Sequence, residues 1–386
     1  MIGQTTSLFE LDDDHLAFQE SCRAFVERVL VSRRDEAERT RTFPKELWAE
    51  FAKAGLLGLR HPEELGGSGG TSVALAILSE ELATVSGGLA ITVLVSSYMA
   101  APHLALFGSP ALQERYLRPI IAGEMVAAIA VTEPGSGSDV AGMRTSATET
   151  DGGFLISGSK MFITNGGIAD VMIVGARTSK DDRHGGITMF AVDASNEGIT
   201  VSAPLVKLGW RSSDTRELTF EGCFVPADHV VGTVGRGFHQ IMAAFQGERI
   251  VLAAMGVGLA RSALDEALVW AKERHAFGSP IGSNQAISHR LSEMTTSVAT
   301  ARLLTWQAAA RLDSGHAEAA ASVAMAKLYG ARVANDVADA ALQIFGGYGF
   351  MDEAPVALHF RDARILRIGG GTDEIQMEIL ARQMGL

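Results

Sequence analysis

The chain has 386 residues, a length that accommodates two or three domains, each with a sizeable hydrophobic core. Its 33 lysines and arginines face 45 aspartates and glutamates, and the formal net charge of -12 argues against binding to nucleic acids or anionic membranes. The two cysteines, Cys22 and Cys223, have neither disulfide-framework nor metal-ligand spacing, which indicates a reducing compartment.

The first third of the sequence is expected to be helical, from residue 12 to about residue 125. Apolar residues recur there every three or four positions, as Cys22, Phe25 and Val29 illustrate. This spacing is typical of amphipathic helices. Pro44 and later loop segments are expected to divide the region into several helices.

The sequence also predicts where the protein resides. Its N-terminus is acidic and has neither the basic nor the apolar region of a secretory leader. The longest wholly apolar stretch, near residues 250–260, is shorter than the roughly 20 residues that span a bilayer. We therefore expect a cytoplasmic protein without a membrane span.

The middle of the chain changes to short β-type runs such as AAIAV, FLISG, VMIVGA and ITMFAV. Clusters of Gly, Asn and Asp bound these runs and favour antiparallel strands. From Gly237 onward the helical pattern returns and continues nearly to the end. The sequence thus predicts an α+β fold with an N-terminal α-helical domain (1–126), a middle antiparallel β domain (127–235) and a C-terminal α-helical domain (236–386).

Two glycine-containing turns are candidate ligand-binding segments. In VTEPGSGSD, residues 131–139, the backbone N–H groups can bind anionic oxygens, and Gly135 and Gly137 allow a phosphate or planar ring to approach closely. In FITNGG, residues 162–167, an aromatic ring, a Thr hydroxyl and an Asn-Gly turn end a β run. Taken alone, the first segment is better explained as a structural turn and the second as a hairpin.

Glu248 is the most informative charged residue. Between Arg236 and Arg261 only Glu248 and Arg249 carry full charge. Such a carboxylate either pairs with an arginine of the core or has a raised pKa, which suits a general base. The residues alone leave both possibilities open. The apolar residues that share its helical stripe are Ile241, Phe245, Leu252, Met255 and Leu259.

The motif RDARILRIGGGTDEIQ, residues 361–376, places three glycines before a Thr-Asp helix start. Its bare backbone could hydrogen-bond a ligand oxygen or simply form a turn between helices. Other chemistries have little support. The GGSGG at 66–70 lacks the strand that precedes a nucleophile elbow, the histidines lack metal-ligand spacing, and the G-x-G at 256–258 lacks the third glycine of a dinucleotide fingerprint.

Five motifs occur together and in order: VTEPGSGSD, KMFITNG, RHAFGSPIGSNQAI, LQIFGGYGF and RDARILRIGGGTDEIQ. In these motifs and their approximate spacing the chain resembles the acyl-CoA dehydrogenase family over essentially its whole length. The resemblance implies a helical domain, a β domain and a C-terminal four-helix bundle domain, with FAD between the last two. It also implies a homotetramer built as a dimer of dimers.

The resemblance assigns residues to the cofactor and the substrate. Those expected at the flavin ring and the adjoining phosphate region are Val131, Thr132, Gly137, Ser138, Phe162 and Thr164, and those expected to touch the cofactor from the last helix are Thr372 and Glu374. Those expected to hold the pyrophosphate and adenine of a neighbouring subunit's FAD are Arg274, Phe277, Gln285, Gln343, Gly346 and Gly347. Those expected on the substrate side are Ser138, Arg249 and Gly370.

One departure from the family pattern concerns the catalytic base. Many members carry a glutamate at the position of Gly370, whereas the long-chain and isovaleryl-type members place it in a Glu-Arg dipeptide of an earlier helix. The sequence GERIVLA matches the second pattern at Glu248 and Arg249. The resemblance therefore assigns Glu248 as the base, and the space expected beside Gly370 favours a long or branched acyl chain.

The implied reaction converts an acyl-CoA to a trans-2-enoyl-CoA. Glu248 removes the α-proton, the Gly370 N–H stabilises the enolate, FAD accepts the β-hydrogen as hydride, and an electron-transferring flavoprotein takes the electrons. Two alternatives are the same chemistry on an acyl-carrier protein and a flavin monooxygenase or oxidase on this fold. A flavin-binding protein without catalysis is disfavoured, because a carboxylate is retained at one of the two base positions.

Overall fold

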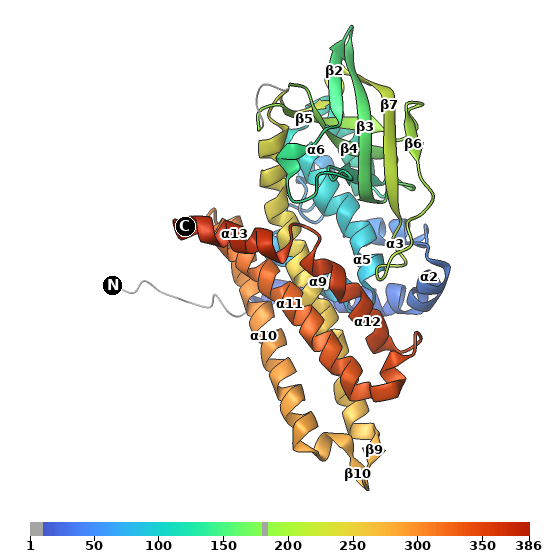
Figure 1. Ribbon diagram of the computed structural model, residues 1–386, viewed down its shortest axis with the longest axis vertical. Coiled ribbons are helices and arrows are strands. Elements are labelled where there is room, and N and C mark those ends of the chain that lie inside the picture. The colour runs from blue at the N-terminus through green and yellow to red at the C-terminus, as the bar shows by residue number, and fades with distance from the viewer. Residues whose placement is uncertain (1–10, 180–183) are drawn as a thin grey trace.

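The computed structural model describes residues 11–179 and 184–386, which form a helical part, a β part and a second helical part in chain order (Figure 1). Residues 1–10, which hold part of the acidic N-terminus, lie outside the described residues. The helices of the first part are α1 (Asp13–Phe25), α2 (Arg34–Thr40), α3 (Leu47–Lys53), α4 (Ser72–Ala83), α5 (Gly87–Leu94), α6 (Ala101–Phe107), α7 (Pro110–Leu112) and α8 (Arg118–Ile121).

Side chains supplied by the sequence cap four of these helices, one of them α7, where Ser109 accepts the Leu112 N–H. Asp12, Thr71 and Ser86 accept hydrogen bonds from backbone N–H groups in the first turns of α1, α4 and α5. A π-helical segment (Val95–Ala100) joins α5 to α6. Every residue of α5 and of this segment is buried, so the helix runs through the centre of the molecule.

Among the described residues two helical stretches, Gly87–Phe107 and Gly237–Glu273, are long and apolar enough, by length and composition, to cross a membrane. In the structure 83% and 61% of their most apolar windows are buried inside the protein. Core helices of packed domains have the same property, so these two stretches are weak evidence for a membrane span.

Within the described residues eight strands form one mixed sheet in the order β6-β7-β3-β2-β4-β5-β8, with β1 beside β4. Most pairs are antiparallel, as expected, but β1 runs parallel to β4, which the sequence analysis did not anticipate. The strands are β1 (Ala127–Ala130), β2 (Ser146–Thr150), β3 (Gly153–Thr164), β4 (Val171–Arg177), β5 (Ile187–Asp193), β6 (Ile199–Val201), β7 (Thr215–Pro226) and β8 (Val230–Val231).

The parallel pairing explains where the first glycine-containing segment lies. Strand β1 pairs with Val171–Val174 and β2 with Arg177, so both follow the same edge of β4 in the same direction. Neighbouring parallel segments need a long connection that leaves the sheet. Residues 131–145 form this connection, so the segment 131–139 leaves the sheet. Within it, Glu133 and Ser136 exchange two backbone hydrogen bonds across a tight turn, as the glycine-containing sequence predicted.

The C-terminal part contains three long helices that lie side by side in Figure 1. Glycines let two of them approach closely, since a Cβ built on Gly256 would lie 2.7 Å from the carbonyl oxygen of Gly330. The elements of this part are α9 (Gly237–Glu273), β9 (His275–Ala276), β10 (Ser279–Pro280), α10 (Gln285–Asp313), α11 (Ala319–Phe345), α12 (Pro355–Ala363) and α13 (Asp373–Gln383).

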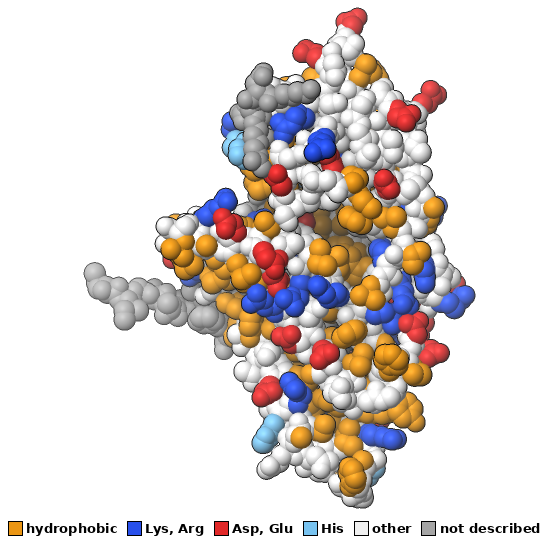
Figure 2. Space-filling view, in the orientation of Figure 1, with side chains coloured by type: hydrophobic (Ala, Val, Ile, Leu, Met, Phe, Trp, Pro, Cys, Tyr) orange, Lys and Arg blue, Asp and Glu red, His pale blue; other side chains and the backbone are white. Residues whose placement is uncertain are grey.

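The end of the bundle near β9 and β10 exposes large hydrophobic side chains. Phe277 is fully exposed, and Tyr348 and Phe350 are 59% and 80% exposed. Figure 2 shows hydrophobic side chains gathered over the lower half of the molecule, where the bundle lies. An exposed apolar surface of this kind indicates an interaction site.

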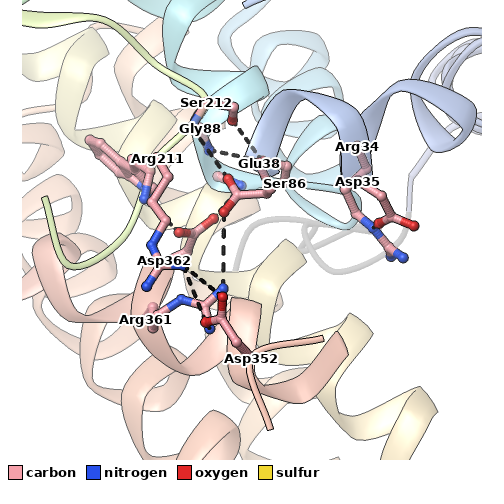
Figure 3. Close-up of polar contacts among 12 residues, drawn as sticks. Arg34, Asp35, Glu38, Ser86, Gly88, Arg211, Ser212, Asp352, Arg361 and Asp362 are labelled. Atoms are coloured by element: carbon pink, nitrogen blue, oxygen red, sulfur yellow. Dashed lines mark hydrogen bonds and ion pairs between the residues drawn. The ribbon is translucent and has the colours of Figure 1, made fainter. Parts of the chain in front are cut away.

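A buried carboxylate joins the three parts of the chain (Figure 3). Asp362 of α12 accepts hydrogen bonds from the N–H of Trp210, at 2.6 Å, and from the N–H of Gly87 at the start of α5, at 3.0 Å. Glu38 of α2 accepts from the Ser212 N–H nearby, at 3.3 Å. Burial, reinforced by the negative charge of Glu38, raises the pKa of Asp362 to about 6.

Candidate active site

Glu248 lies on α9 within an apolar stretch of the helix. The residues expected to share its stripe are buried at Ile241, Leu252, Met255 and Leu259, and partly buried at Phe245. Glu248 is partly buried and forms no hydrogen bond or ion pair with any of the described residues, so a structural pair with an arginine is not observed. Burial raises its pKa to about 7, although the nearby charges of Arg249 and Lys327 oppose the rise.

Gly370, in the loop between α12 and α13, faces Glu248. Its φ of +62° is a conformation that favours glycine, and a Cβ built on it would lie 3.3 Å from Glu248 Oε1. The family resemblance allows a catalytic carboxylate at position 248 or at position 370, and in the structure these two positions lie next to each other. The Gly370 N–H has no acceptor among the described residues, so it is free to bind a ligand oxygen beside this carboxylate.

The space that the sequence led us to expect beside Gly370 is occupied. A Cβ on Gly370 would lie only 2.3 Å from Leu252 Cδ1. Leu252 follows Glu248 by one helical turn and therefore reaches the same loop. The tip of Leu252 therefore lies where a side chain at position 370 would begin, so this geometry gives no support to the open space expected beside Gly370.

Two polar side chains that the sequence analysis did not single out hold this loop. The buried Lys327 of α11 donates through Nζ to the Gly371 carbonyl at 2.5 Å. The buried Gln376 of α13 donates to the same carbonyl at 3.0 Å and to the Gly370 carbonyl at 3.3 Å. Lys327 had a visible signal, because it is the lone charge in the stretch VAMAKLYGA.

The two segments expected at the flavin end lie next to each other. The Met161 N–H donates to the Thr132 carbonyl at 2.9 Å. The buried Lys160 donates to the Val131 carbonyl at 3.1 Å and forms an ion pair of 2.9 Å with Glu133. Glu133 also accepts two backbone N–H groups from the end of the loop. Lys160 and Glu133 were missed by the sequence analysis, although both stand inside the quoted motifs.

The surface of these segments fits a planar, anionic cofactor such as FAD. The Phe162 ring is 62% exposed, and Thr164 beside it is partly buried at the end of β3. The N–H groups of Gly135, Gly137 and Ser138 donate to no acceptor among the described residues. A Cβ on either glycine would meet nothing within 4 Å, so a ligand can reach the bare backbone.

Thr372 and Glu374 lie at the start of α13, as the sequence predicted. Thr372 is the N-cap and accepts the Ile375 N–H at 3.3 Å. Glu374 is exposed, and hydrogen bonds from the backbone and from Thr372 lower its pKa. Both residues directly follow the loop that contains Gly370.

The remaining residues expected to bind FAD lie at the far end of α9. Arg274 follows this helix, and its guanidinium lies 5.5 Å from the centre of the Tyr348 ring. At about 1.5 Å per residue, Arg274 is roughly 39 Å along the helix axis from Glu248. One chain therefore does not bring these two groups together. The other residues at this end are Phe277, Gln285, Gln343, Gly346 and Gly347.

The described residues offer neither a nucleophile elbow nor a metal cluster. The segment 66–70 follows a short 3-10 turn (Glu63–Leu65) and no strand, so it cannot form a nucleophile elbow. In the described part of the chain no group of three or more His, Cys, Asp or Glu side chains could hold a metal ion.

Three family models match successive segments of the chain. They describe the N-terminal domain of acyl-CoA dehydrogenase (residues 12–124), its middle domain (residues 128–223) and its C-terminal domain (residues 235–385). Together they cover the site at Glu248 and Gly370 and the far end of α9.

Known proteins resemble the chain over nearly its whole length. An isovaleryl-CoA dehydrogenase of Oryza sativa is 37% identical over 97% of this chain and 91% of its own. The butyryl-CoA dehydrogenase structure from Megasphaera elsdenii has a TM-score of 0.94 and 36% identity, over 98% and 100% of the chains. A structure described as an electron transferring flavoprotein of Acidaminococcus fermentans contains a chain with a TM-score of 0.94 and 33% identity, over 97% and 99%.

Proposed function

The chain belongs to the acyl-CoA dehydrogenase family, and we propose that it desaturates an acyl-CoA thioester between the α and β carbons with Glu248 as the base. As a member of this family it is an FAD-dependent oxidoreductase that acts on CH–CH groups. One observation carries the assignment of the base: Glu248 Oε1 lies 3.3 Å from the Cβ position of Gly370. A carboxylate carried by α9 therefore reaches the same place in the site as the side chain of a glutamate at position 370 would.

The proposed chemistry uses groups whose surroundings suit their tasks. Glu248 has a pKa of about 7, so it is a stronger base than an ordinary carboxylate and a substantial fraction of it is ionised at neutral pH. The α-proton of a thioester is weakly acidic, so charge that develops on the thioester oxygen must be stabilised. The Gly370 N–H donates to this oxygen, and one such donor is worth about 3 kcal/mol. FAD, when bound, supplies the acceptor for the β-hydrogen.

The residues proposed to hold FAD fall into two groups that come from different chains. The first group lies at 131–138 and 162–164 and presents free N–H groups and an exposed aromatic ring. The second group surrounds Arg274, whose planar guanidinium suits a pyrophosphate. Because roughly 39 Å of helix separates Arg274 from Glu248, we propose that a second copy completes the site within a homotetramer. Arg274→Ala should then weaken both FAD binding and self-association.

The physiological partners are part of the same proposal. We propose that electrons leave through an electron-transferring flavoprotein, supported by the similarity to a chain in the Acidaminococcus fermentans structure. A long or branched acyl chain is supported by the Glu-Arg placement of the base and by the similarity to isovaleryl-CoA dehydrogenase. A cytoplasmic location is supported by Cys22 and Cys223, which are buried and unpaired.

The decisive experiment is anaerobic reduction of the flavin by substrates. A panel of straight and branched acyl-CoA thioesters should bleach the bound flavin, and Glu248→Gln should slow bleaching by roughly 10² to 10⁴ while FAD stays bound. Asp313→Asn is a matched control, because Asp313 is an acidic residue at the end of α10 that pairs with Arg60. Near-normal bleaching by Glu248→Gln with every good substrate would place the base elsewhere.

Two further measurements separate the alternative reactions. If an acyl chain bound to an acyl-carrier protein bleaches the flavin and no acyl-CoA does, the enzyme desaturates acyl chains carried by that protein. Stoichiometric peroxide formation in air at the rate of turnover would instead assign an oxidase. The proposed dehydrogenase should reduce an electron-transferring flavoprotein or a dye much faster than it reduces O₂.

A further inference from the structure

Lys327 is a fully buried lysine on α11 that reaches the same turn as the proposed base, since its ammonium bonds Gly371 and Glu248 Oε1 lies 3.3 Å from the Cβ position of Gly370. Its Nζ donates to the Gly371 carbonyl at 2.5 Å. Burying a lysine is costly unless the ammonium is hydrogen-bonded and near negative charge. Because this costly buried charge lies at the candidate active site, we expect Lys327 to have a role in the reaction.

Close packing of two helices brings Lys327 to the level of Glu248. A Cβ on Gly330 would lie 3.0 Å from the Ala253 carbonyl, and one on Gly256 would lie 2.7 Å from the Gly330 carbonyl. Lys327 precedes Gly330 by about one turn of α11, and Glu248 precedes Ala253 by somewhat more than one turn of α9. The glycine contact therefore sets the separation of the two charged groups.

The charges around this pair come from three helices. Arg249 of α9 and Lys327 of α11 both favour the ionised form of Glu248. Burial lowers the pKa of Lys327 to about 8, and the charge of Arg249 acts in the same direction, whereas Asp373 and Glu374 on α13 and Glu248 itself favour the charged form. Lys327 is therefore charged where Glu248, with a pKa of about 7, titrates. Asp373 is itself paired with two arginines, so its negative charge is largely neutralised. Glu248 forms no such pair among the described residues.

We propose that Lys327 is a positioning residue that fixes the Gly370–Gly371 turn through the Gly371 carbonyl and favours the ionised form of Glu248. The inference rests on the proposed function of Glu248 as the base. Anchoring the Gly371 carbonyl, together with Gln376, keeps the Gly370 N–H directed toward the thioester oxygen. The ammonium charge keeps the base deprotonated over a wider pH range than burial alone would allow.

Three substitutions separate the hydrogen bond from the charge. Lys327→Arg keeps both, Lys327→Gln keeps a donor without the charge, and Lys327→Met removes both. The readout is the pH dependence of substrate bleaching in the FAD-loaded enzyme. The acid limb of this profile is the range in which the bleaching rate rises with pH as the base loses its proton. Lys327→Gln and Lys327→Met should move the acid limb to higher pH by about one unit, as expected for loss of a nearby opposite charge. Met should also slow bleaching above this limb by about tenfold, because the oxyanion donor loses its support.

Arg332→Gln is the structural control, because Arg332 also belongs to α11 and holds α13 through Asp373 at 3.2 Å. It should lower thermal stability without moving the acid limb. An acid limb that stays in place in Lys327→Gln and Lys327→Met would overturn the inference, as would an Arg variant that behaves like the Met variant. If the Met variant does not fold, the comparison of Gln with Arg decides. Failure of the proposed function is a separate result, seen as normal bleaching by Glu248→Gln.

Discussion

A carboxylic acid that acts as a base near neutral pH needs surroundings that raise its pKa without keeping it protonated. On α9 the apolar stripe around Glu248 raises the pKa, and the charges of Arg249 and Lys327 limit the rise to a value of about 7. An ordinary salt bridge would have lowered this pKa and weakened the base. The absence of such a pair among the described residues is therefore a property that suits the proposed task.

The pH dependence of the reaction follows from this pKa. Only the ionised form of Glu248 can accept a proton, so the second-order rate constant for bleaching, measured at subsaturating acyl-CoA, should rise with pH through about 7 and then level off. Stopped-flow measurement of anaerobic bleaching across this range tests the expectation. A rate that stays constant from well below to well above pH 7 would contradict it.

Residues differ in how visible they are in the sequence. Glu248 could be recognised because a lone Glu-Arg dipeptide interrupts a long apolar helix. Lys327 interrupts another apolar helix, but its meaning depends on a carbonyl 44 residues away. Leu252 gave no signal at all, since one more leucine on a buried stripe does not reveal that it faces Gly370.

At the scale of elements, the loop between β1 and β2 depends on a buried ion pair. Lys160 of β3 is fully buried and pairs with Glu133 of the loop at 2.9 Å. Glu133 fastens the far end of the loop through two backbone N–H groups. Burial lowers the pKa of Lys160 to about 8, although Glu133 opposes the change.

Lys160→Met should therefore leave a buried carboxylate without its cation and destabilise the protein by about 3–5 kcal/mol. The double variant Glu133→Gln/Lys160→Met should recover much of this loss, because neither remaining group is charged. Arg382→Met, which breaks an exposed pair with Glu378, should cost less than about 1 kcal/mol. Urea unfolding of the FAD-loaded variants measures all three. Equal stability of the two Lys160 variants would show that the pair is not what holds the loop.

The order of elements was readable from the sequence, whereas their pairing was not. Runs of apolar residues with periods near two and near 3.6 indicated strands and helices in the correct order. The parallel alignment of β1 with β4 depends on how residues 131–145 cross the sheet, and no local pattern encodes this path. The sequence correctly indicated a turn in that connection, which lies between Glu133 and Ser136, but not the path of the connection as a whole.

At the scale of the whole molecule, Asp362 connects α12, α5 and the segment before β7. Its raised pKa means that the folded protein holds its proton more tightly than the unfolded chain does. This contribution to stability is complete below the unfolded pKa of 3.8 and is lost as pH rises through about 6. Neutral pH therefore loosens a junction that all three parts of the chain share.

Asp362→Asn removes this titration. The stability of the wild type relative to this variant should fall by about 3 kcal/mol as pH rises from about 4 to about 7. Asp352→Asn is the matched control, because Asp352 is exposed and pairs with Arg211 and Arg361 in the same cluster, so it should change stability by less than about 1 kcal/mol. Thermal unfolding at a series of pH values measures both differences. A wild-type-to-Asn difference that does not vary with pH would disprove the assignment.

The length of α9 makes the protein suitable for genetic complementation between two inactive alleles. Glu248 and Arg274 lie on one helix, roughly 39 Å apart, and are proposed to serve different sites. An assembly of Arg274→Ala chains with Glu248→Gln chains should thus contain sites in which the base of the first meets the arginine of the second. Co-expression should restore part of the activity that neither allele has alone, whereas mixing preassembled proteins should restore it only as fast as their subunits exchange.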